Sequence, residues 1–228
     1  HPIDQTSNYS DLSFFRNCEF IVNDNMDDVM DFNQFVGLED VEGIEFIACD
    51  FKNNSSSSST GLQGRVGINA ADAYFEVVPL SSSSGAKRSV FEDLHIGIQA
   101  LGTGSERFFI VDKADFNRND FGVITSAVNK AEITRNKFLV SRNLNYGIST
   151  AITSFNSSGY RIEENHIAKE TGINDPTYGI RIYNSGSSPN ERTPITGLSG
   201  LLLTSRSGAR LTLIPRFFSS SPTASPAK

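Results

Sequence analysis

Five polar side chains of this 228-residue chain are candidates for acid–base chemistry: Asp120, Arg118, Arg135, Glu163 and His166. A carboxylate beside an arginine suits abstraction of a proton, and two carboxylates about 5 to 10 Å apart suit hydrolysis of a glycosidic bond. Either reaction requires these groups to converge in a groove on one strand face. The five residues need not share a face, so a structure must show whether they meet.

Other acidic clusters fit catalysis or metal binding less well. Glu163 and Glu164 are neighbours, and neighbouring residues on a strand point to opposite faces. The acidic stretch at 24–31 contains Asp27-Asp28 but lacks the Asp-x-Asp-x-Asp-Gly order of an EF-hand loop. A solvated loop is therefore favoured there over a calcium site, and we expect no cofactor.

A six-residue pattern recurs along the chain: an apolar residue, two variable ones, Asn or Cys, a polar residue and a second apolar one. Clear copies begin at Phe15, Phe46, Phe116, Ile133 and Ile162, and a degenerate copy begins at Phe91. The residue before the last apolar position is polar in every copy: Glu19, Asp50, His95, Asp120, Lys137 and His166. Period-two alternation predicts that these polar side chains point outward.

A second pattern places Gly between two apolar residues, at Gly97, Gly122, Gly147 and Gly179, with spacings of 25, 25 and 32 residues. Such spacings with short alternating strands predict an all-β fold, one repeat being one coil of a parallel β-helix, or β-solenoid. These glycines are expected at bends with positive φ. Serine-rich runs at 53–59 and 81–84 are expected to leave the solenoid as irregular loops.

Stacked coils bring equivalent positions into columns that pack like on like. The pattern predicts two inward apolar columns. The first is Phe15, Phe46, Phe116, Ile133 and Ile162, and the second is Phe20, Phe51, Phe121, Phe138 and Ile167. Between them lies a column of small, buryable residues: Cys18, Cys49, Asn119, Asn136 and Asn165.

With these phrases the chain resembles the right-handed parallel β-helix repeat proteins of the pectin-lyase-like superfamily, in particular large secreted bacterial surface proteins. The resemblance covers residues 12–190. It implies that Asn119, Asn136 and Asn165 form an asparagine ladder at a tight turn, with Cys18 and Cys49 at the ladder position of earlier coils. Ladder amides that bond to turn backbone need no ligand.

The catalytic phrases of family enzymes are not found as a set, because the only Asp-Asp is Asp27-Asp28 in the acidic stretch. The hydrolases of the polygalacturonase type use Asn-Thr-Asp, Asp-Asp, Gly-His-Gly and Arg-Ile-Lys, and this chain has no Gly-His-Gly. Arg181-Ile182-Tyr183 lacks the terminal Lys. The resemblance therefore implies a fold and a secreted protein, but it does not indicate a particular family of enzymes.

Cys18 and Cys49 lie 31 residues apart and belong to no CxxC or Cys/His metal pattern. Stacked coils would bring their Cα atoms within disulfide range, which leaves a disulfide open. Two buried thiols that pack as small hydrophobes are favoured, because in-register stacking points both Cβ atoms the same way.

The charge distribution divides the chain. Residues 192–228 hold five of the 20 basic residues and none of the 26 acidic ones, so residues 1–191 carry 15 basic and 26 acidic side chains. We expect a repeat domain at 1–191 and, at 192–228, a basic Pro/Ser-rich tail of uncertain structure outside the solenoid. A second interpretation is that the natural solenoid continues and this stretch was translated in a shifted frame or truncated, and it is favoured because the break falls within a coil.

The net charge of −6 disfavours nucleic acid as a partner, and no apolar run approaches the length of a membrane span. We expect an extracellular or cell-surface location, the signal lying outside this chain. The favoured function is a non-catalytic structural or adhesive role with weak glycan binding, in a fragment of a longer protein. Its partners would be polysaccharide, cell-envelope or host-surface components.

Two other functions stay open. One is a polysaccharide lyase or glycosidase that acts on acidic polysaccharide, and the other is a trimer that resembles a phage tail spike. Turnover of polyuronates or neutral glycans would indicate the first, and an obligate oligomer would indicate the second.

Overall fold

The computed structural model describes residues 13–22, 34–54, 65–82, 85–103, 108–141, 148–172 and 177–185, and the backbone of three later strands. Every regular element in these ranges is a β-strand. The all-β prediction is therefore confirmed. The acidic stretch at 24–31, the serine-rich run at 55–59 and Gly147 lie outside the described residues.

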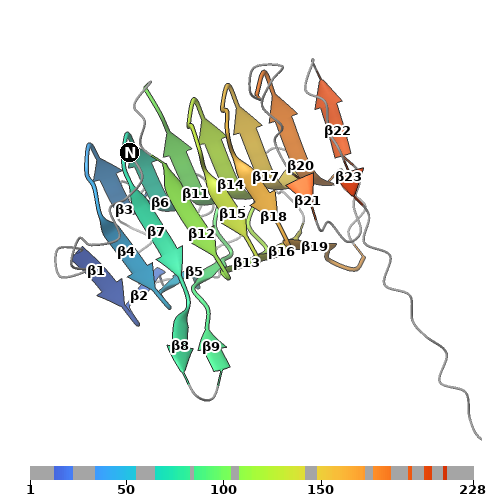
Figure 1. Ribbon diagram of the computed structural model, residues 1–228. Coiled ribbons are helices and arrows are strands. Elements are labelled where there is room, and N and C mark those ends of the chain that lie inside the picture. Colours follow the sequence, from blue (N-terminus) through green and yellow to red (C-terminus); the bar gives the residue numbers. More distant parts are fainter. Residues whose placement is uncertain are drawn as a thin grey trace, which may run out of the picture.

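The strands form three parallel sheets (Figure 1). Sheet A contains β1 (Ser13–Arg16), β4 (Ile44–Ile47), β7 (Phe75–Val78), β12 (Phe109–Asp112), β15 (Glu132–Thr134), β18 (Arg161–Glu163), β21 (Ile195–Thr196) and β23 (Leu213–Ile214). Sheet B contains β2 (Glu19–Val22), β5 (Asp50–Asn53), β10 (Val90–Glu92), β13 (Asp115–Asn117), β16 (Lys137–Val140) and β19 (His166–Lys169). Sheet C contains β3 (Gln34–Glu39), β6 (Val66–Ala71), β11 (Ile96–Leu101), β14 (Phe121–Ser126), β17 (Ser149–Phe155), β20 (Thr177–Tyr183) and β22 (Leu203–Arg206).

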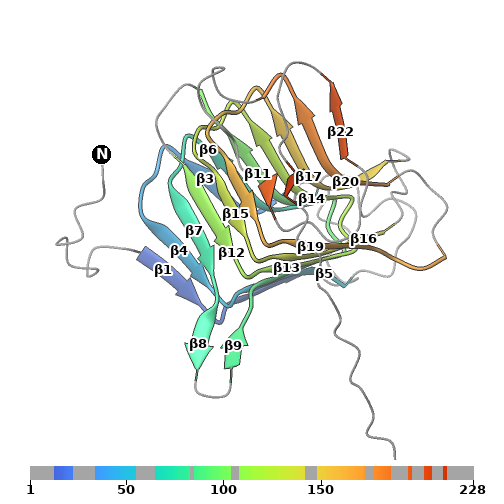
Figure 2. The same cartoon turned by 45° about the vertical axis from the view of Figure 1, so that its right-hand side comes forward.

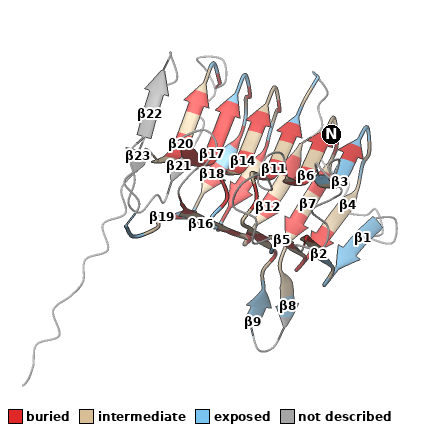
Figure 3. Cartoon of the chain, turned by 180° about the vertical axis from the view of Figure 1, so that it is seen from behind, coloured by how far each residue is buried: buried red, intermediate tan, exposed pale blue. Residues whose placement is uncertain are grey.

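The chain passes from sheet A to sheet B to sheet C and then begins the next coil, so strands of successive coils pair in parallel (Figure 2). This arrangement is a parallel β-solenoid, as the repeat predicts. We call its turns the A–B, B–C and C–A corners. Side chains that point inward from all three sheets are buried in a continuous core (Figure 3).

A stack of phenylalanine rings forms the inner face of sheet B. It contains Phe20, Phe51, Phe91, Phe116 and Phe138, whose successive ring centroids are 4.7, 4.7, 4.8 and 4.6 Å apart with planes within 8° of parallel. The spacing equals that of neighbouring strands, about 4.8 Å, because each ring comes from the next coil. The last coil continues the column with Ile167, which pairs with Phe138.

The predicted columns were wrong at three positions, Phe116, Phe121 and Asn119, because the six-residue pattern marks two different corners. Copies that begin at Phe15, Phe46, Ile133 and Ile162 span the A–B corner, whereas those that begin at Phe91 and Phe116 span the B–C corner. Phe116 therefore joins the ring stack of sheet B, and Phe121 lies in sheet C between Ile96 and Thr150. Both corners are tight turns followed by an inward residue, so one pattern fits both.

The glycines of the second pattern make room for the rings. A Cβ on Gly122 would lie 2.5 Å from the Ala151 carbonyl oxygen and 2.8 Å from the Phe138 ring, and Gly97 meets Phe116 in the same way. Positive φ was the wrong expectation for Gly97, Gly122 and Gly179, because the described glycines that adopt it lie elsewhere. The requirement is close approach of the sheet C backbone to the ring stack.

Corner residues take the left-handed conformation instead. Those at the A–B and B–C corners include Lys113, Arg135, Glu164, Asp93 and Arg118, with φ between 53° and 56°. This conformation costs a non-glycine residue about 1 to 2 kcal/mol. The cost is offset by the pairing on both sides of each corner.

An amide ladder follows the left-handed residue at the A–B corner. Its column is Cys18, Cys49, Ser89, Ala114, Asn136 and Asn165, as the strand register requires. The backbone N–H of Asn136 donates to Asn165 Oδ1 at 2.9 Å, and Asn136 Oδ1 accepts from the Ala114 N–H at 2.8 Å. Each such bond joins one coil to the next.

The other corners have their own ladders. At the B–C corner, Asn119 Oδ1 accepts from the Leu94 N–H at 2.9 Å, and its Nδ2 donates to the Phe91 carbonyl at 2.9 Å. At the C–A corner, Ser157 and Ser185 play the same part, the Ser157 N–H donating to Ser185 Oγ at 3.1 Å. The serine ladder was not predicted.

Within the described residues, one insertion projects from the solenoid. β8 (Leu80–Ser82) and β9 (Gly85–Lys87) form an antiparallel hairpin that projects from the solenoid at the A–B corner (Figures 1 and 2). In the C-terminal part, β21 pairs with β18, β22 with β20 and β23 with β21. The rest of 192–228 is outside the described residues, and the division at residue 191 stays a prediction.

The ring stack predicts a large stability difference between two phenylalanine substitutions. Phe116→Ala leaves a cavity between two fully covered rings and is expected to lower the free energy of unfolding by about 3 to 5 kcal/mol. Phe14→Ala removes a ring that is 58% exposed and is expected to cost less than about 1 kcal/mol. Urea unfolding midpoints measure both, and equal losses would contradict the assignment of the stack.

Candidate functional site

The outer face of sheet A carries a cluster of charged side chains. Strand register places outward residues in two columns along the solenoid. One column is Glu45, Glu76, Ile110, Glu132 and Arg161, and the other is Arg16, Ile47, Val78, Asp112, Thr134 and Glu163. Inward residues such as Val111, Ile133 and Ile162 alternate with them and fix the outward direction.

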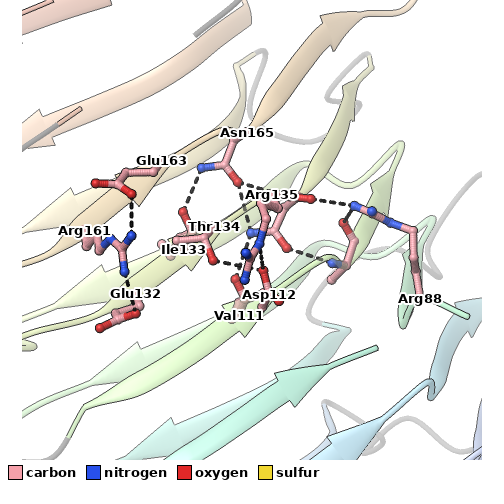
Figure 4. Close-up of polar contacts among 12 residues, drawn as sticks. Arg88, Val111, Asp112, Glu132, Ile133, Thr134, Arg135, Arg161, Glu163 and Asn165 are labelled. Carbon is pink, nitrogen blue, oxygen red and sulfur yellow. Dashed lines mark hydrogen bonds and ion pairs between the residues drawn. The ribbon is translucent and has the colours of Figure 1, made fainter. Parts of the chain in front are cut away.

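An open hollow of about 270 Å³ lies on this face over β7, β12, β15 and β18. Figure 4 shows the polar contacts among several of the residues that line it. Its lining is Val78, Ile110, Asp112, Glu132, Thr134, Arg135, Arg161, Glu163 and Glu164. Four of these residues are acidic and two are arginines. The hollow is therefore polar, doubly negative in formal charge and spread over successive coils.

Arg135 reaches into the hollow from the A–B corner. Its Nε donates to Asp112 Oδ1 at 2.7 Å, and the same oxygen accepts from Thr134 Oγ1 at 3.0 Å. The hydrogen bond to Asp112 raises the pKa of the Arg135 guanidinium. The Asp112 side chain is 14% exposed and that of Arg135 is 51% exposed, so the carboxylate fixes a guanidinium that still faces solvent.

Arg161 forms the second fixed guanidinium. One terminal nitrogen donates to Glu163 Oε2 at 2.6 Å, and the other lies 3.6 Å from Glu132 Oε2. The hydrogen bond to Glu163 raises the pKa of Arg161. Arg161 is 52% exposed. An arginine has five N–H donors, so donors remain for a ligand.

Arg88 stabilises the corner at Arg135 through hydrogen bonds (Figure 4). One terminal nitrogen donates to the Arg135 carbonyl at 2.8 Å and to the Ala114 carbonyl at 3.1 Å, while Nε donates to Asp115 Oδ1 at 2.5 Å. These bonds join three coils at the left-handed position of Arg135. Arg88 follows the inserted hairpin, so the repeat gives no signal for it.

Only two of the five predicted site residues line the hollow: Arg135 and Glu163. His166 lies on β19 in sheet B, where it pairs with Lys137. Asp120 lies at the B–C corner, 5% exposed, with its Oδ2 2.8 Å from His95 Nδ1. The structure therefore divides the predicted strip between separate faces.

Arg118 also belongs to the B–C corner. It donates two hydrogen bonds to Asp93, at 2.8 and 2.7 Å, and one to Glu92 at 2.8 Å. The bonds to Asp93 are the main cause that raises the pKa of Arg118 above its ordinary value. Arg118 therefore ties its coil to the preceding one.

Several lining residues were missed in the sequence. Glu132, Thr134 and Arg161 flank the inward Ile133 and Ile162, so alternation around the pattern could have identified them. Asp112 was hidden because Ala114 holds the ladder position of its coil, and the six-residue pattern is not visible there.

A pair of carboxylates lies nearby in the same face. Glu45 and Glu76 are register partners on β4 and β7, and the Tyr74 hydroxyl donates to Glu76 Oε1. Burial raises the pKa of Glu45, Glu76 raises it further and Arg16 partly offsets both. Glu45 precedes Phe46 as Glu132 precedes Ile133, so alternation could have identified it. Glu76 had no signal in the repeat, because β7 belongs to the coil interrupted by the hairpin.

The outer face of sheet C is different in chemistry. The Arg181 guanidinium lies 4.7 Å from the Tyr178 ring centroid and 4.9 Å from that of Tyr183. Tyr183 stacks on Phe155 at 5.0 Å. In Arg181-Ile182-Tyr183, the arginine and the tyrosine form a cation–π contact. The segment was compared above with the catalytic Arg-Ile-Lys of polygalacturonase-type hydrolases.

The described residues contain no candidate metal site and no candidate membrane-spanning helix. In the described ranges no three His, Cys, Asp or Glu side chains are placed to hold a metal ion. The part of the chain that the structure describes also contains no helix able to cross a membrane. The calcium alternative at 24–31 falls outside these residues.

No family model, curated protein or solved structure matches this chain. The parallel β-solenoid is thus established by strand pairing, and the resemblance to the pectin-lyase-like superfamily rests on the repeat.

Glu45 predicts a pH-dependent stability effect. A carboxyl group whose pKa is raised on folding favours the folded state when protonated, and this contribution is lost as the pH rises through the folded pKa. Glu45→Gln is therefore expected to raise the Tm relative to the wild type at pH 7 to 8, with the difference vanishing below the ordinary value of 4.5. Thermal unfolding across this pH range tests it. A variant that is less stable at pH 8 and equal at pH 4 would contradict the assignment.

Proposed function

We propose that this solenoid is a non-catalytic structural or adhesive module that binds a neutral, hydroxyl-rich polysaccharide in the hollow of sheet A. The observation that carries the proposal is the pair of half-exposed guanidiniums, Arg135 and Arg161, each fixed by carboxylates. Fixed donors lose little conformational freedom on binding, which is what a weak multi-point contact with hydroxyl groups needs.

The charges of the hollow favour a neutral ligand over an acidic one. Asp112, Glu132, Glu163 and Glu164 outnumber the two arginines, so a polyuronate would meet net repulsion. The hollow also extends along the coils, which suits a linear polymer more than a compact molecule. Repeated weak contacts on a surface add through multivalency.

Ion pairing supports the non-catalytic assignment. Asp112 is bonded to Arg135 and Thr134, while Glu163 and Glu132 share Arg161. A carboxylate oxygen that already accepts from a guanidinium or a hydroxyl group has fewer lone pairs left for a substrate. A module of this kind suits a secreted or cell-surface protein of the pectin-lyase-like type, which is the class the repeat resembles.

Affinity electrophoresis through gels that contain a neutral glucan, mannan or galactan tests the proposal. We expect at least one neutral polysaccharide to retard the wild type more than polygalacturonate does. The Arg135→Ala/Arg161→Ala double variant is expected to lose most of the retardation, because its remaining carboxylates offer no N–H donors.

Arg118→Ala is the matched control, since this arginine is also ion-paired but lies at the B–C corner. It should be retarded like the wild type. Equal retardation of the double variant and the wild type would place binding elsewhere, and stronger retardation by polygalacturonate would overturn the choice of a neutral ligand.

A glycosidase is the second candidate function, and Glu45 with Glu76 is the observation that favours it. Neighbouring parallel strands are about 4.8 Å apart, close to the separation of about 5 to 5.5 Å between the carboxyl groups of retaining enzymes. The raised pKa of Glu45 suits a general acid, and a second carboxylate beside it suits a nucleophile.

This alternative predicts new reducing ends when the protein is incubated with neutral or acidic polysaccharides. Either Glu45→Gln or Glu76→Gln should then abolish the release, whereas Glu132→Gln should preserve it. The binding proposal predicts no release by any of these proteins. Release that persists in both Glu45→Gln and Glu76→Gln would exclude this pair as the catalytic site.

A further inference from the structure

Cys18 and Cys49 occupy adjacent positions of the A–B ladder. Register pairs the residues on both sides of them, Arg16 with Ile47 and Glu19 with Asp50. The Asp50 N–H also donates to the Cys18 carbonyl at 2.9 Å. Because neighbouring parallel strands are about 4.8 Å apart, the two Cα atoms fall within the usual disulfide range of about 4.4 to 6.8 Å.

The Cys49 side chain is directed toward the coil of Cys18. Both cysteines are free thiols. Cys49 Sγ donates to the Phe15 carbonyl at 3.2 Å, and Phe15 belongs to the coil of Cys18. Cys18 Sγ donates to the Arg16 carbonyl of its own coil at 3.6 Å.

The pair has one accessible and one buried member. Cys18 is half-buried at the edge of the core, whereas Cys49 is fully buried. Burial raises the pKa of the Cys49 thiol, so a smaller fraction of it is the reactive thiolate near neutral pH. An external reagent therefore meets Cys18 first, and Cys49 is the resolving thiol within reach.

The coil that carries Cys18 is less buried than the coils that follow it. β1 is exposed along its whole length, and Phe15 is 39% exposed although it stacks on Phe46. Among the described strands, this coil pairs with the next coil through β1–β4, β2–β5 and β3–β6 and with no other. Strands with one partner open more easily than central ones.

We propose that Cys18 and Cys49 form a redox-sensitive staple that locks the coil of β1, β2 and β3 to the next coil. The oxidant is a low-molecular-weight disulfide such as oxidised glutathione. The Cys18 thiolate attacks one sulfur of that disulfide, which releases one glutathione thiolate and leaves a mixed disulfide on Cys18.

The Cys49 thiolate then attacks the Cys18 sulfur and releases the second glutathione thiolate. Two protons pass from the protein thiols to the released thiolates. The protein loses two electrons and gains one disulfide bond, while the reagent is reduced to two thiols. Formation of the bond breaks the Cys49 hydrogen bond to the Phe15 carbonyl and needs a small shift of the exposed coil.

The experiment compares the whole chain reduced with dithiothreitol and the same chain treated with oxidised glutathione. Non-reducing peptide mapping is expected to find one peptide pair joined through Cys18 and Cys49, with the mass lowered by two hydrogen atoms. The Tm is expected to rise by about 5 to 15 °C on oxidation, because the bond restricts the unfolded chain. Dithiothreitol should reverse both changes.

Cys18→Ser and Cys49→Ser are the controls. Ser89 fills the same ladder column and accepts from the Cys49 N–H at 3.0 Å, so serine is compatible with this position. Neither variant should gain stability on oxidation, and Cys49→Ser should retain glutathione on Cys18. In the wild type, two separate glutathione adducts, dimers linked between chains or unreacted thiols would each overturn the proposal.

Discussion

In-register stacking of the phenylalanine rings on sheet B is the constraint on which the rest of the structure depends. Centroid distances of 4.6 to 4.8 Å match the strand spacing, so the stack holds successive coils at one height and one rotation. Gly97 and Gly122 exist to admit the rings, since a Cβ there would overlap them. Where the column ends in Ile167, the corresponding sheet C position holds Ala151 in place of glycine.

The same register produces the candidate site. Because equivalent residues stand above one another, outward side chains of sheet A form columns without any dedicated loop. The hollow is lined by the corner residues Arg135 and Glu164 together with Asp112 and Glu163, which lie in one outward column of sheet A. Both corner residues are left-handed, and the amide ladder through Asn136 and Asn165 fixes the turn that they occupy.

Sequence reasoning succeeds where the physics is periodic. Alternation and the repeat spacing predict the all-β solenoid, since burial of every second residue leaves a direct trace in the sequence. It fails where two corners share one pattern, so Phe116 and Phe121 were put in the wrong columns. It also fails at insertions, because the β8–β9 hairpin interrupts the repeat just before Arg88. In the coil of Asp112 the ladder position holds Ala114 in place of Asn or Cys, so the six-residue pattern cannot be recognised there. Arg135 and Glu163 could be named as candidates, but their separation from Asp120 depends on a sheet assignment that the pattern does not contain.

The most direct test of polysaccharide binding in the hollow is a crystal structure with a neutral oligosaccharide bound. We expect sugar density over β12, β15 and β18, with hydroxyl groups within hydrogen-bond distance of the Arg135 and Arg161 guanidiniums. Density on the aromatic outer face of sheet C beside Arg181, with the hollow of sheet A empty, would contradict it.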